Sequence, residues 1–574
     1  MRKKISLLII LLFSFNLTFI SCDSRTPEET QADFDKYINE TFKEAFGEDS
    51  FSTHFFLEYP ENYDIKQDKV SIGHYKSDLE DCDLDEDIKE LKSFNYDNLT
   101  KKQQILYDKL LYHCELQEDF ADCKDLSTPL GRNKSVIANT TSNFTEYAFY
   151  EEKDINDYLE LLKQLPDYYD EAIDFAKKQI DNNVIPTDTA LDTNIKYCNN
   201  YSNKKDNVFI VSFNDKIDEL TNIDSTKKQE LKKQNEEIVT TLLIPKYREI
   251  SNTLTSLKGS NTDPKGLANI NGGKNYYEAL VKSYTGSSKS PSKLLSSLNS
   301  RINNLILEFT KISSKNPNIL NELNDVKVNY NTPDSALNKL KNEITTDYPS
   351  LPNVNYKAKY LPEELEMDGV IAYYLSPQID NPNNNIIKVN KNAVSDKSLS
   401  LFSTLAHEGY PGHLYQRNYY KNTNPYNVEY LLSYLGYTEG WATYAELDSF
   451  NMCDLNDDNL IRLLQIDNLL NNYLTCAVDI MVNYNNDSLS DIESYLSTYY
   501  GANQAESIAS SIYDFVISDP ACMLSYGVGY IELTDLQDCY KDNAGEKYNE
   551  EDFLKKVLDI GPCSFDTLKK YILD

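Results

Sequence analysis

The residues best suited to chemistry lie in "AHEGYPGH", residues 406–413, which holds two of the five histidines in a chain of 574 residues. A pair of imidazoles can bind a divalent metal, and a carboxylate beside them can take a proton from a water that the metal holds. We therefore predict that His407 and His413 are metal ligands and that Glu408 is the general base.

The spacing of the two histidines is unusual, because they lie six positions apart. Ligands four positions apart share one face of a helix, whereas six positions would direct His413 away from His407. Pro411 has no N–H to donate to the carbonyl of His407, and its ring collides with that carbonyl, so a regular helix must fail there. Gly412 tolerates the dihedrals that a detour needs. A distorted turn is therefore predicted to return His413 to the face of His407.

A second interpretation of the motif needs no metal. In it, His407 ends one helix and His413 begins the next, with no common ligand between the two rings. In both interpretations the helix before the motif is predicted to start at Asp396 or Ser398, either of which is a suitable N-cap. The motif alone leaves both interpretations open.

A zinc site of this kind needs a third protein ligand and an open position for water. Downstream, "YTEGWATYAE" (437–446) places Glu439, Thr443 and Glu446 on one face of a helix. Glu439 is predicted to be the third ligand, because Gly440 beside it leaves room for a close helix approach. Glu446 is predicted to accept a hydrogen bond from a ligating histidine. The alternative for Glu446 is an exposed acidic face.

Several stretches together resemble a known family: "AHEGYPGHLYQ", "YTEGWATYAE", "GVIAYYLSP", "DPACMLSYGVGYIEL" and "GGKNYYEALVKSYTG". They look like the bacterial family catalogued as domain of unknown function 885, most strongly over residues 350–574. In layout the chain is similar to the helical zinc peptidases typified by carboxypeptidase Taq, angiotensin-converting enzyme and the oligopeptidases. The resemblance implies a largely helical fold, one Zn²⁺ held by the two motif histidines and a downstream glutamate, and peptide cleavage in a deep cleft.

The resemblance also implies a role for a tyrosine near the C-terminus, since the related peptidases use one to stabilise the oxyanion. Tyr526 is the position that matches by motif. The helix that carries it is predicted to begin at Asp519 and Pro520, a good N-cap and N1 pair. Tyr530, four residues further on, is predicted to contact substrate. The alternative for either tyrosine is packing.

Two short segments rich in β-branched residues and tyrosine are predicted to form an antiparallel pair, "GVIAYYLSP" (369–377) and "NNIIKVN" (384–390). A sheet edge beside a metal site can hold an extended peptide by main-chain hydrogen bonds. Tyr373 and Tyr374 are therefore predicted to bind substrate. An ordinary hairpin that caps the helices is the alternative.

Helical periodicity dominates the rest of the chain. We predict a mainly α, large multi-helix, metallopeptidase-like fold with a central cleft and a small antiparallel β element. The predicted organisation is a signal peptide (1–21), a lipid-anchored tether with the first helix (22–60), an N-terminal helical lobe (61–350) and a lobe that bears the zinc site (351–574). The single tryptophan, Trp441, is predicted to lie in the core.

The N-terminus has the pattern of an export signal, with three basic residues before an apolar run that ends at about residue 20. "FISC" then resembles the lipobox at which bacterial lipoproteins are cut and acylated. Cys22 is therefore predicted to carry a lipid anchor on the extracellular face of the bacterial cell membrane, with simple secretion as the alternative.

The charge balance excludes some partners. With 57 Lys and Arg against 91 Asp and Glu, the formal net charge is −34, so the surface repels nucleic acid and anionic headgroups. Membrane contact is predicted only through the lipid anchor. Oligomeric state stays open.

These observations predict an extracellular zinc metallopeptidase, a hydrolase that cleaves peptide substrates with metal-activated water. The alternative is a surface lipoprotein that binds peptides or a partner in the same cleft without catalysis. A metallohydrolase that acts on a non-peptide amide is a third possibility.

Overall fold

The structure is a computed structural model that describes residues 25–573 except 48, 76–83, 122, 182–183, 325, 329, 331, 345–346, 362–365, 367–369 and 392–398. The predicted signal peptide, the lipidation candidate Cys22 and the N-cap candidates Asp396 and Ser398 lie outside the described residues. Among the described residues helices dominate, as the sequence predicts. In the same part of the chain, no helix combines the length and the apolar character that a membrane span requires.

The helices and strands follow one another along the chain in three groups. The first group comprises α1 (Pro27–Glu44), α2 (Ser50–Phe56), α3 (Leu84–Leu91), α4 (Lys101–Ala121), α5 (Val136–Glu146), α6 (Glu152–Asp181), α7 (Asp188–Tyr201), α8 (Val208–Glu219), α9 (Ser225–Ile238) and α10 (Ile244–Leu257). The second comprises α11 (Gly273–Thr285), α12 (Pro291–Lys315), α13 (Ile319–Asn324), α14 (Pro333–Glu343), β1 (Tyr356–Tyr360), β2 (Ala372–Leu375) and β3 (Asn385–Val389). The third comprises α15 (Leu399–Glu408), α16 (His413–Asn422), α17 (Leu435–Ser449), α18 (Asp458–Ile480), α19 (Leu489–Tyr500), α20 (Ala502–Ser518), α21 (Leu524–Ala544), α22 (Glu550–Ile560) and α23 (Phe565–Leu573).

The small sheet has the strand order β1-β3-β2. β2 pairs antiparallel with β3, from Ala372 opposite Val389 to Leu375 opposite Ile386, so the predicted antiparallel pair is confirmed. β1 pairs parallel with β3, so the sheet is mixed and the prediction of a purely antiparallel element is wrong. The sequence of β1, "YKAKY", contains no β-branched residue, and for that reason it shows no strand pattern.

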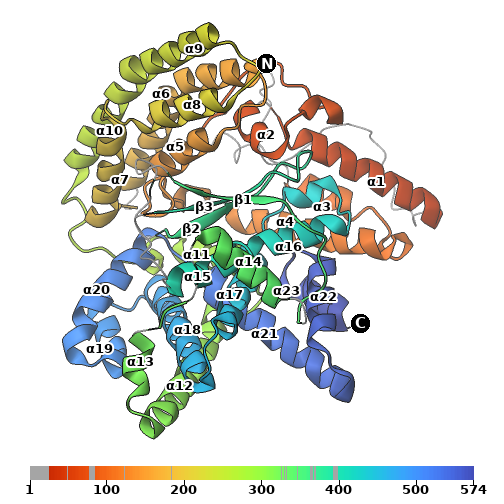
Figure 1. The fold of residues 1–574 in the computed structure, drawn as a ribbon, viewed down its shortest axis with the longest axis vertical. Helices are drawn as coiled ribbons and strands as arrows, with labels where there is room; N and C mark the ends of the chain where they lie inside the picture. Colours follow the sequence, from red (N-terminus) through yellow and green to blue (C-terminus); the bar gives the residue numbers. More distant parts are fainter. Residues whose placement is uncertain are drawn as a thin grey trace.

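The buried apolar residues form two clusters. The smaller cluster is built mainly from α5–α10. The larger cluster contains residues of α1 and α4, the sheet, and the helices from α11 to the C-terminus. Figure 1 shows α5–α10 gathered at the upper left, above the sheet, whereas α15, α17, α18 and α21 lie below it.

The two cores do not follow the order of the chain. The chain instead leaves the larger core after α4 and returns to it at α11. Within the segment predicted as a tether with the first helix, α1 buries Phe34, Ile38 and Phe42 in the larger core. The predicted division into two lobes near residue 350 stays a prediction.

Candidate metal centre

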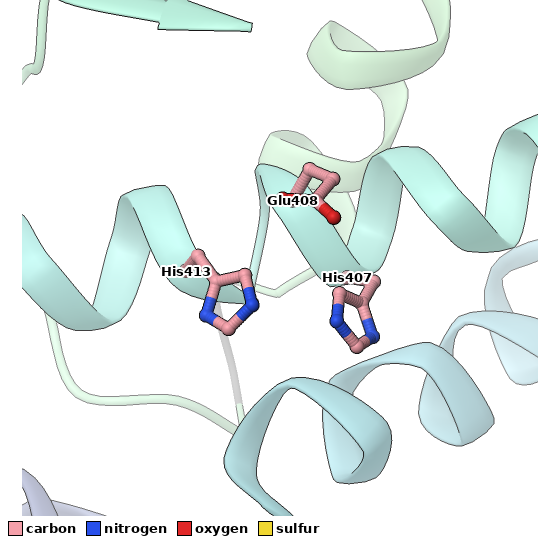
Figure 2. A group of neighbouring side chains, drawn as sticks. All are labelled: His407, Glu408 and His413. Carbon is pink, nitrogen blue, oxygen red and sulfur yellow. The ribbon is translucent and has the colours of Figure 1, made fainter. Parts of the chain in front are cut away.

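The motif histidines lie at the facing ends of two helices. His407 is the next-to-last residue of α15, and His413 is the first residue of α16. These boundaries agree with the interpretation that needs no metal, yet the two rings converge, with centroids 4.9 Å apart and planes nearly perpendicular. Figure 2 shows both rings and Glu408 at the break between the two helices. The predicted return of His413 toward His407 is therefore confirmed.

The turn between the helices depends on close backbone packing. The N–H of Gly412 donates to the carbonyl of Ala406 at 2.9 Å. A Cβ atom on Gly412 would lie 1.7 Å from the carbonyl oxygen of His407. The requirement for glycine that the structure shows at this position is the close approach. The buried Trp441 also fixes the turn, because its indole N–H donates to the carbonyl of Pro411 at 2.8 Å.

Glu439 faces both imidazoles. Its Oε2 lies 3.3 Å from Nε2 of His407 and 3.5 Å from Nε2 of His413. Charge-assisted N–H···O hydrogen bonds are shorter, about 2.7–2.9 Å. Around a tetrahedral cation with ligand distances of about 2.0–2.2 Å, neighbouring donor atoms lie about 3.3–3.5 Å apart. These two distances are long for charge-assisted hydrogen bonds, and they fit shared coordination of one cation.

α17 supplies Glu439, and its glycine-rich start brings it close to α21. A Cβ atom on Gly440 would lie 2.5 Å from the backbone of Gly529 in α21. The close helix approach predicted from Gly440 is thus confirmed.

Glu446, two turns further along α17, holds His407 from the other side of the ring. Its Oε2 lies 3.3 Å from Nδ1 of His407, and its Oε1 accepts a hydrogen bond from Asn468 at 2.9 Å. With the proton on Nδ1 and directed at Glu446, the lone pair of Nε2 is free for a metal. Burial lowers the pKa of His407, but the hydrogen bonds to Glu439 and Glu446 outweigh burial and raise that pKa well above its ordinary value.

Glu408 lies beside the histidines but has a different partner. Its Oε2 accepts the backbone N–H of Tyr374, in the edge strand β2, at 2.9 Å. Ligand atoms of Glu408, His407 and His413 lie within 4.8 Å of one another, so Glu408 also competes for the role of third ligand. Glu439 is assigned that role because one of its oxygens faces both Nε2 atoms, at 3.3 Å and 3.5 Å, whereas Glu408 is bonded to Tyr374. Burial raises the pKa of Glu408, which suits a group that takes up a proton.

Tyr526 is the predicted tyrosine that the fold brings to the histidines. Its ring stacks on that of His407, with centroids 6.0 Å apart. The charge of Glu439, together with burial, raises the pKa of Tyr526 well above its ordinary value, so the phenol keeps its proton and can donate it in a hydrogen bond. The predicted helix start is wrong, since α21 begins at Leu524. Asp519 ends α20 instead, and its carboxylate accepts backbone N–H groups of residues 132–134.

The other predicted substrate-binding tyrosines lie in three different surroundings. Tyr530 lines a small cavity of about 130 Å³ with Arg462, away from the histidines. The hydroxyl of Tyr373 donates to Glu146 of α5 at 3.1 Å. Tyr374 lines a larger cavity that His413 also lines. Of the three, only Tyr374 borders the histidine site.

This larger cavity, about 420 Å³, contains two residues that the sequence analysis missed, Gln416 and Arg417. Both belong to α16, and Arg417 lies four residues after His413, on the same face of the helix. That spacing is the signal in the sequence that points to Arg417.

The fold and the site together define a mainly helical protein in which two histidines and a glutamate can hold one divalent cation, with a second glutamate beside them. The chain belongs to the family described as "Bacterial protein of unknown function (DUF885)", whose model matches residues 62–572. The resemblance to this family is confirmed, and the similarity to zinc peptidases stays a prediction.

Two solved structures have a similar fold. The first, described as a "putative lipoprotein" from Colwellia psychrerythraea, has a TM-score of 0.77 and 17% identity, over 95% of this chain and 98% of that one. The second, a "putative lipoprotein of unknown function" from Shewanella oneidensis, has a TM-score of 0.61 and 15% identity, over 96% of this chain and 100% of that one. A comparison with curated proteins finds no match.

Proposed function

We propose that the chain is a zinc-dependent peptidase that acts outside the cell. The proposal depends on one observation, the position of Oε2 of Glu439 between the two imidazoles, 3.3 Å from Nε2 of His407 and 3.5 Å from Nε2 of His413. Two imidazoles and one carboxylate are a ligand set that catalytic zinc sites use, with a further position left for water or substrate.

The residues around this site supply the other requirements of amide hydrolysis. When bound, Zn²⁺ would supply Lewis acidity, which lowers the pKa of a water and polarises a carbonyl. Glu408, whose pKa is raised by burial, takes the proton of the attacking water and passes it to the leaving nitrogen. Tyr526 keeps its proton and donates a hydrogen bond to the developing oxyanion.

A peptide substrate is supported by the position of β2. This strand is at the edge of the sheet, and its Tyr374 N–H reaches Glu408. An extended chain laid along the edge of β2 would pass beside Glu408, with main-chain hydrogen bonds that need no particular side chain.

The proposed location is the outer face of the bacterial cell membrane, anchored through a lipid on Cys22. The support is the "FISC" sequence at the end of the apolar run and the description of both structural neighbours as putative lipoproteins.

Elemental analysis of purified protein tests the metal. The wild type is expected to hold about one zinc per chain, and His413→Ala is expected to hold much less, because it removes one of three protein ligands. His74→Ala is the matched control, since His74 is exposed and its ring bonds to Glu171, far from the site along the chain. Equal zinc content in the wild type and His413→Ala would refute the proposal.

A further inference from the structure

Arg417 differs from the other arginines that the structure describes. Each of those donates a hydrogen bond to a carboxylate or a carbonyl: Arg25, Arg132, Arg248, Arg301 and Arg462. Among the described residues, the guanidinium of Arg417 has no such partner, and it lies over the ring of Tyr430, 4.0 Å from Cζ to the centroid. In a chain with 91 acidic residues, Arg417 is thus the one described arginine without a carboxylate or carbonyl acceptor.

The surroundings of Arg417 make this lack of a partner costly. Arg417 is half-buried, and burial lowers the pKa of its guanidinium. A cation removed from water without an anion loses several kcal/mol of hydration free energy, by order of magnitude. A protein keeps such a group where it binds an anionic ligand.

The cavity that Arg417 lines offers further donors. Gln416 is 5% exposed, and its side-chain nitrogen has no hydrogen-bond partner in the described part of the chain. The hydroxyl-bearing residues Ser376, Ser433 and Thr438 also line the cavity. Its lining therefore suits a ligand that accepts hydrogen bonds and carries negative charge.

The one acidic residue in the lining is already neutralised. Glu429 accepts a hydrogen bond from the buried Lys109 at 2.7 Å, from the hydroxyl of Tyr420, and from the backbone N–H of Tyr426 at 2.8 Å. With Glu429 paired in this way, the cavity keeps the positive charge of Arg417 uncompensated.

We propose that this cavity is a subsite for a carboxylate of the substrate, with Arg417 as the residue that binds it. The proposal rests on the proposed function, because His413 lines the same cavity. It adds a substrate class, namely peptides with a carboxylate close to the bond that is cleaved. Arg417 is thus a residue that determines specificity.

The distance along α16 limits where that carboxylate lies. Arg417 lies four positions after His413, which corresponds to about 6 Å along the helix axis. An extended peptide advances about 3.3 Å per residue. The carboxylate therefore lies on the order of one to three residues from the cleaved bond. Two sources supply such a group: the C-terminus of a short peptide or an acidic side chain.

Calorimetric titration of the zinc-loaded Glu408→Gln protein tests the subsite without turnover. One pair of probes is N-acetyl-trialanine as the free acid and as the C-terminal amide. The other pair is N-acetyl-Ala-Glu-Ala-amide and its Gln counterpart. A preference in the first pair identifies a C-terminal carboxylate, and a preference in the second identifies an acidic side chain.

The proposal predicts that the acid of one pair binds about 10- to 100-fold more tightly than its neutral partner, the range for a charge-assisted interaction. When Arg417→Gln is added to Glu408→Gln, the affinities for the acid and for its neutral partner should agree within about 2-fold. Arg417→Lys should keep part of the preference, because it keeps the charge but loses the bidentate geometry. Arg248→Gln is the matched control and should keep the full preference for the acid.

Three results would overturn the subsite. The first is an acid preference that survives Arg417→Gln. The second is the absence of a preference, or of binding, in both pairs. The third is a marked fall in melting temperature for Arg417→Gln, since loss of an unpaired cation should leave stability equal or higher. Zinc content and turnover are measured separately from peptide binding. A protein that binds no zinc and cleaves no peptide, but still prefers the acid, would refute the proposed peptidase function and leave the carboxylate subsite intact.

Discussion

Glu408 and Glu439 both lie beside the motif histidines, yet their surroundings give them opposite proton affinities. Burial raises the pKa of Glu408. Burial acts in the same direction on Glu439, but the charge of His413 and hydrogen bonds to both histidines outweigh it and hold the pKa of Glu439 well below its usual range. A pair of carboxylates separated in this way suits one proton acceptor and one permanently charged ligand.

The assignment of Glu408 as the proton acceptor predicts the effect of Glu408→Gln. The amide cannot take up a proton, so peptide turnover should fall by about 10²- to 10⁴-fold. Zinc content should stay near the wild-type value, because the three ligands are intact. Measurement of kcat and of zinc per chain on the same preparation checks both. Glu506→Gln, an exposed position, is the control. Turnover at the wild-type rate would contradict the assignment.

In the proposed site Glu446 would act on the metal through His407, so its substitution should change metal affinity more than catalysis. Glu446→Gln weakens the acceptor at Nδ1 of His407 and is expected to lower zinc affinity by about 10- to 100-fold. Competition with a chelator of known affinity measures this change. An unchanged affinity would show that Glu446 only packs against the ring.

Residue types and spacing were enough to predict the histidines, Glu408, Glu439 and Glu446 as neighbours, because each chemistry restricts the side chains that can perform it. They were not enough for Arg417. The property that singles out this residue among the described arginines is the lack of a carboxylate or carbonyl acceptor, which depends on how α16 packs against distant segments. No local pattern in one sequence carries that information.

At the level of elements, the crossing of α17 and α21 sets the position of Glu439. Gly440→Ala would place a methyl group 2.5 Å from the backbone of Gly529 and force the helices apart. We expect a loss of about 1–3 kcal/mol in the free energy of unfolding, together with weaker zinc binding. Urea unfolding and chelator competition measure the two effects.

Gly545→Ala is the matched control for this crossing. A Cβ atom there meets nothing within 4 Å, although the φ of +55° makes alanine strained. Gly545→Ala should lower the free energy of unfolding by about 1 kcal/mol and leave zinc affinity unchanged. Equal zinc affinity in Gly440→Ala and the control would mean that the crossing does not position the ligand.

Elements with a strong local pattern were predictable, and those defined by distant pairing were not. α15 follows from its apolar periodicity, and it buries Leu401, Phe402 and Leu405 as its pattern suggests. β1 carries no such pattern, and only its pairing with β3 makes it a strand. Asp519 has the residue type of an N-cap, but its carboxylate is taken by a loop almost 400 residues earlier in the chain.

On the scale of the whole molecule, a buried acid joins segments of the larger core. Asp479 of α18 accepts hydrogen bonds from Tyr277 of α11 at 2.7 Å, from Asn483 at 3.0 Å and from the backbone of Ala521 at 2.8 Å. Burial raises the pKa of Asp479 to about 7, despite these hydrogen bonds. Folding therefore favours the protonated acid.

This raised pKa predicts a pH dependence of stability. Below pH about 4 the folded and unfolded states both hold the proton, so burial of Asp479 carries no cost of charge. Between pH about 4 and about 7 the unfolded state loses the proton that the folded state keeps, so stability relative to Asp479→Asn should fall by no more than about 4 kcal/mol and then level off. Urea unfolding of both proteins between pH 4 and 8 measures the difference. The hydrogen bond lost in Asp479→Asn changes the difference in free energy of unfolding by the same amount at every pH. A difference that does not change with pH would therefore contradict the prediction.

Strand β2 connects the two cores at adjacent residues. The hydroxyl of Tyr373 bonds to Glu146, at the end of α5 in the smaller helical cluster, and the backbone of Tyr374 bonds to Glu408 in the larger one. Glu408 is thus linked, through the peptide unit between Tyr373 and Tyr374, to a helix on the other side of the sheet. Any change in the position of α5 that moved β2 would also move the backbone N–H that Glu408 accepts.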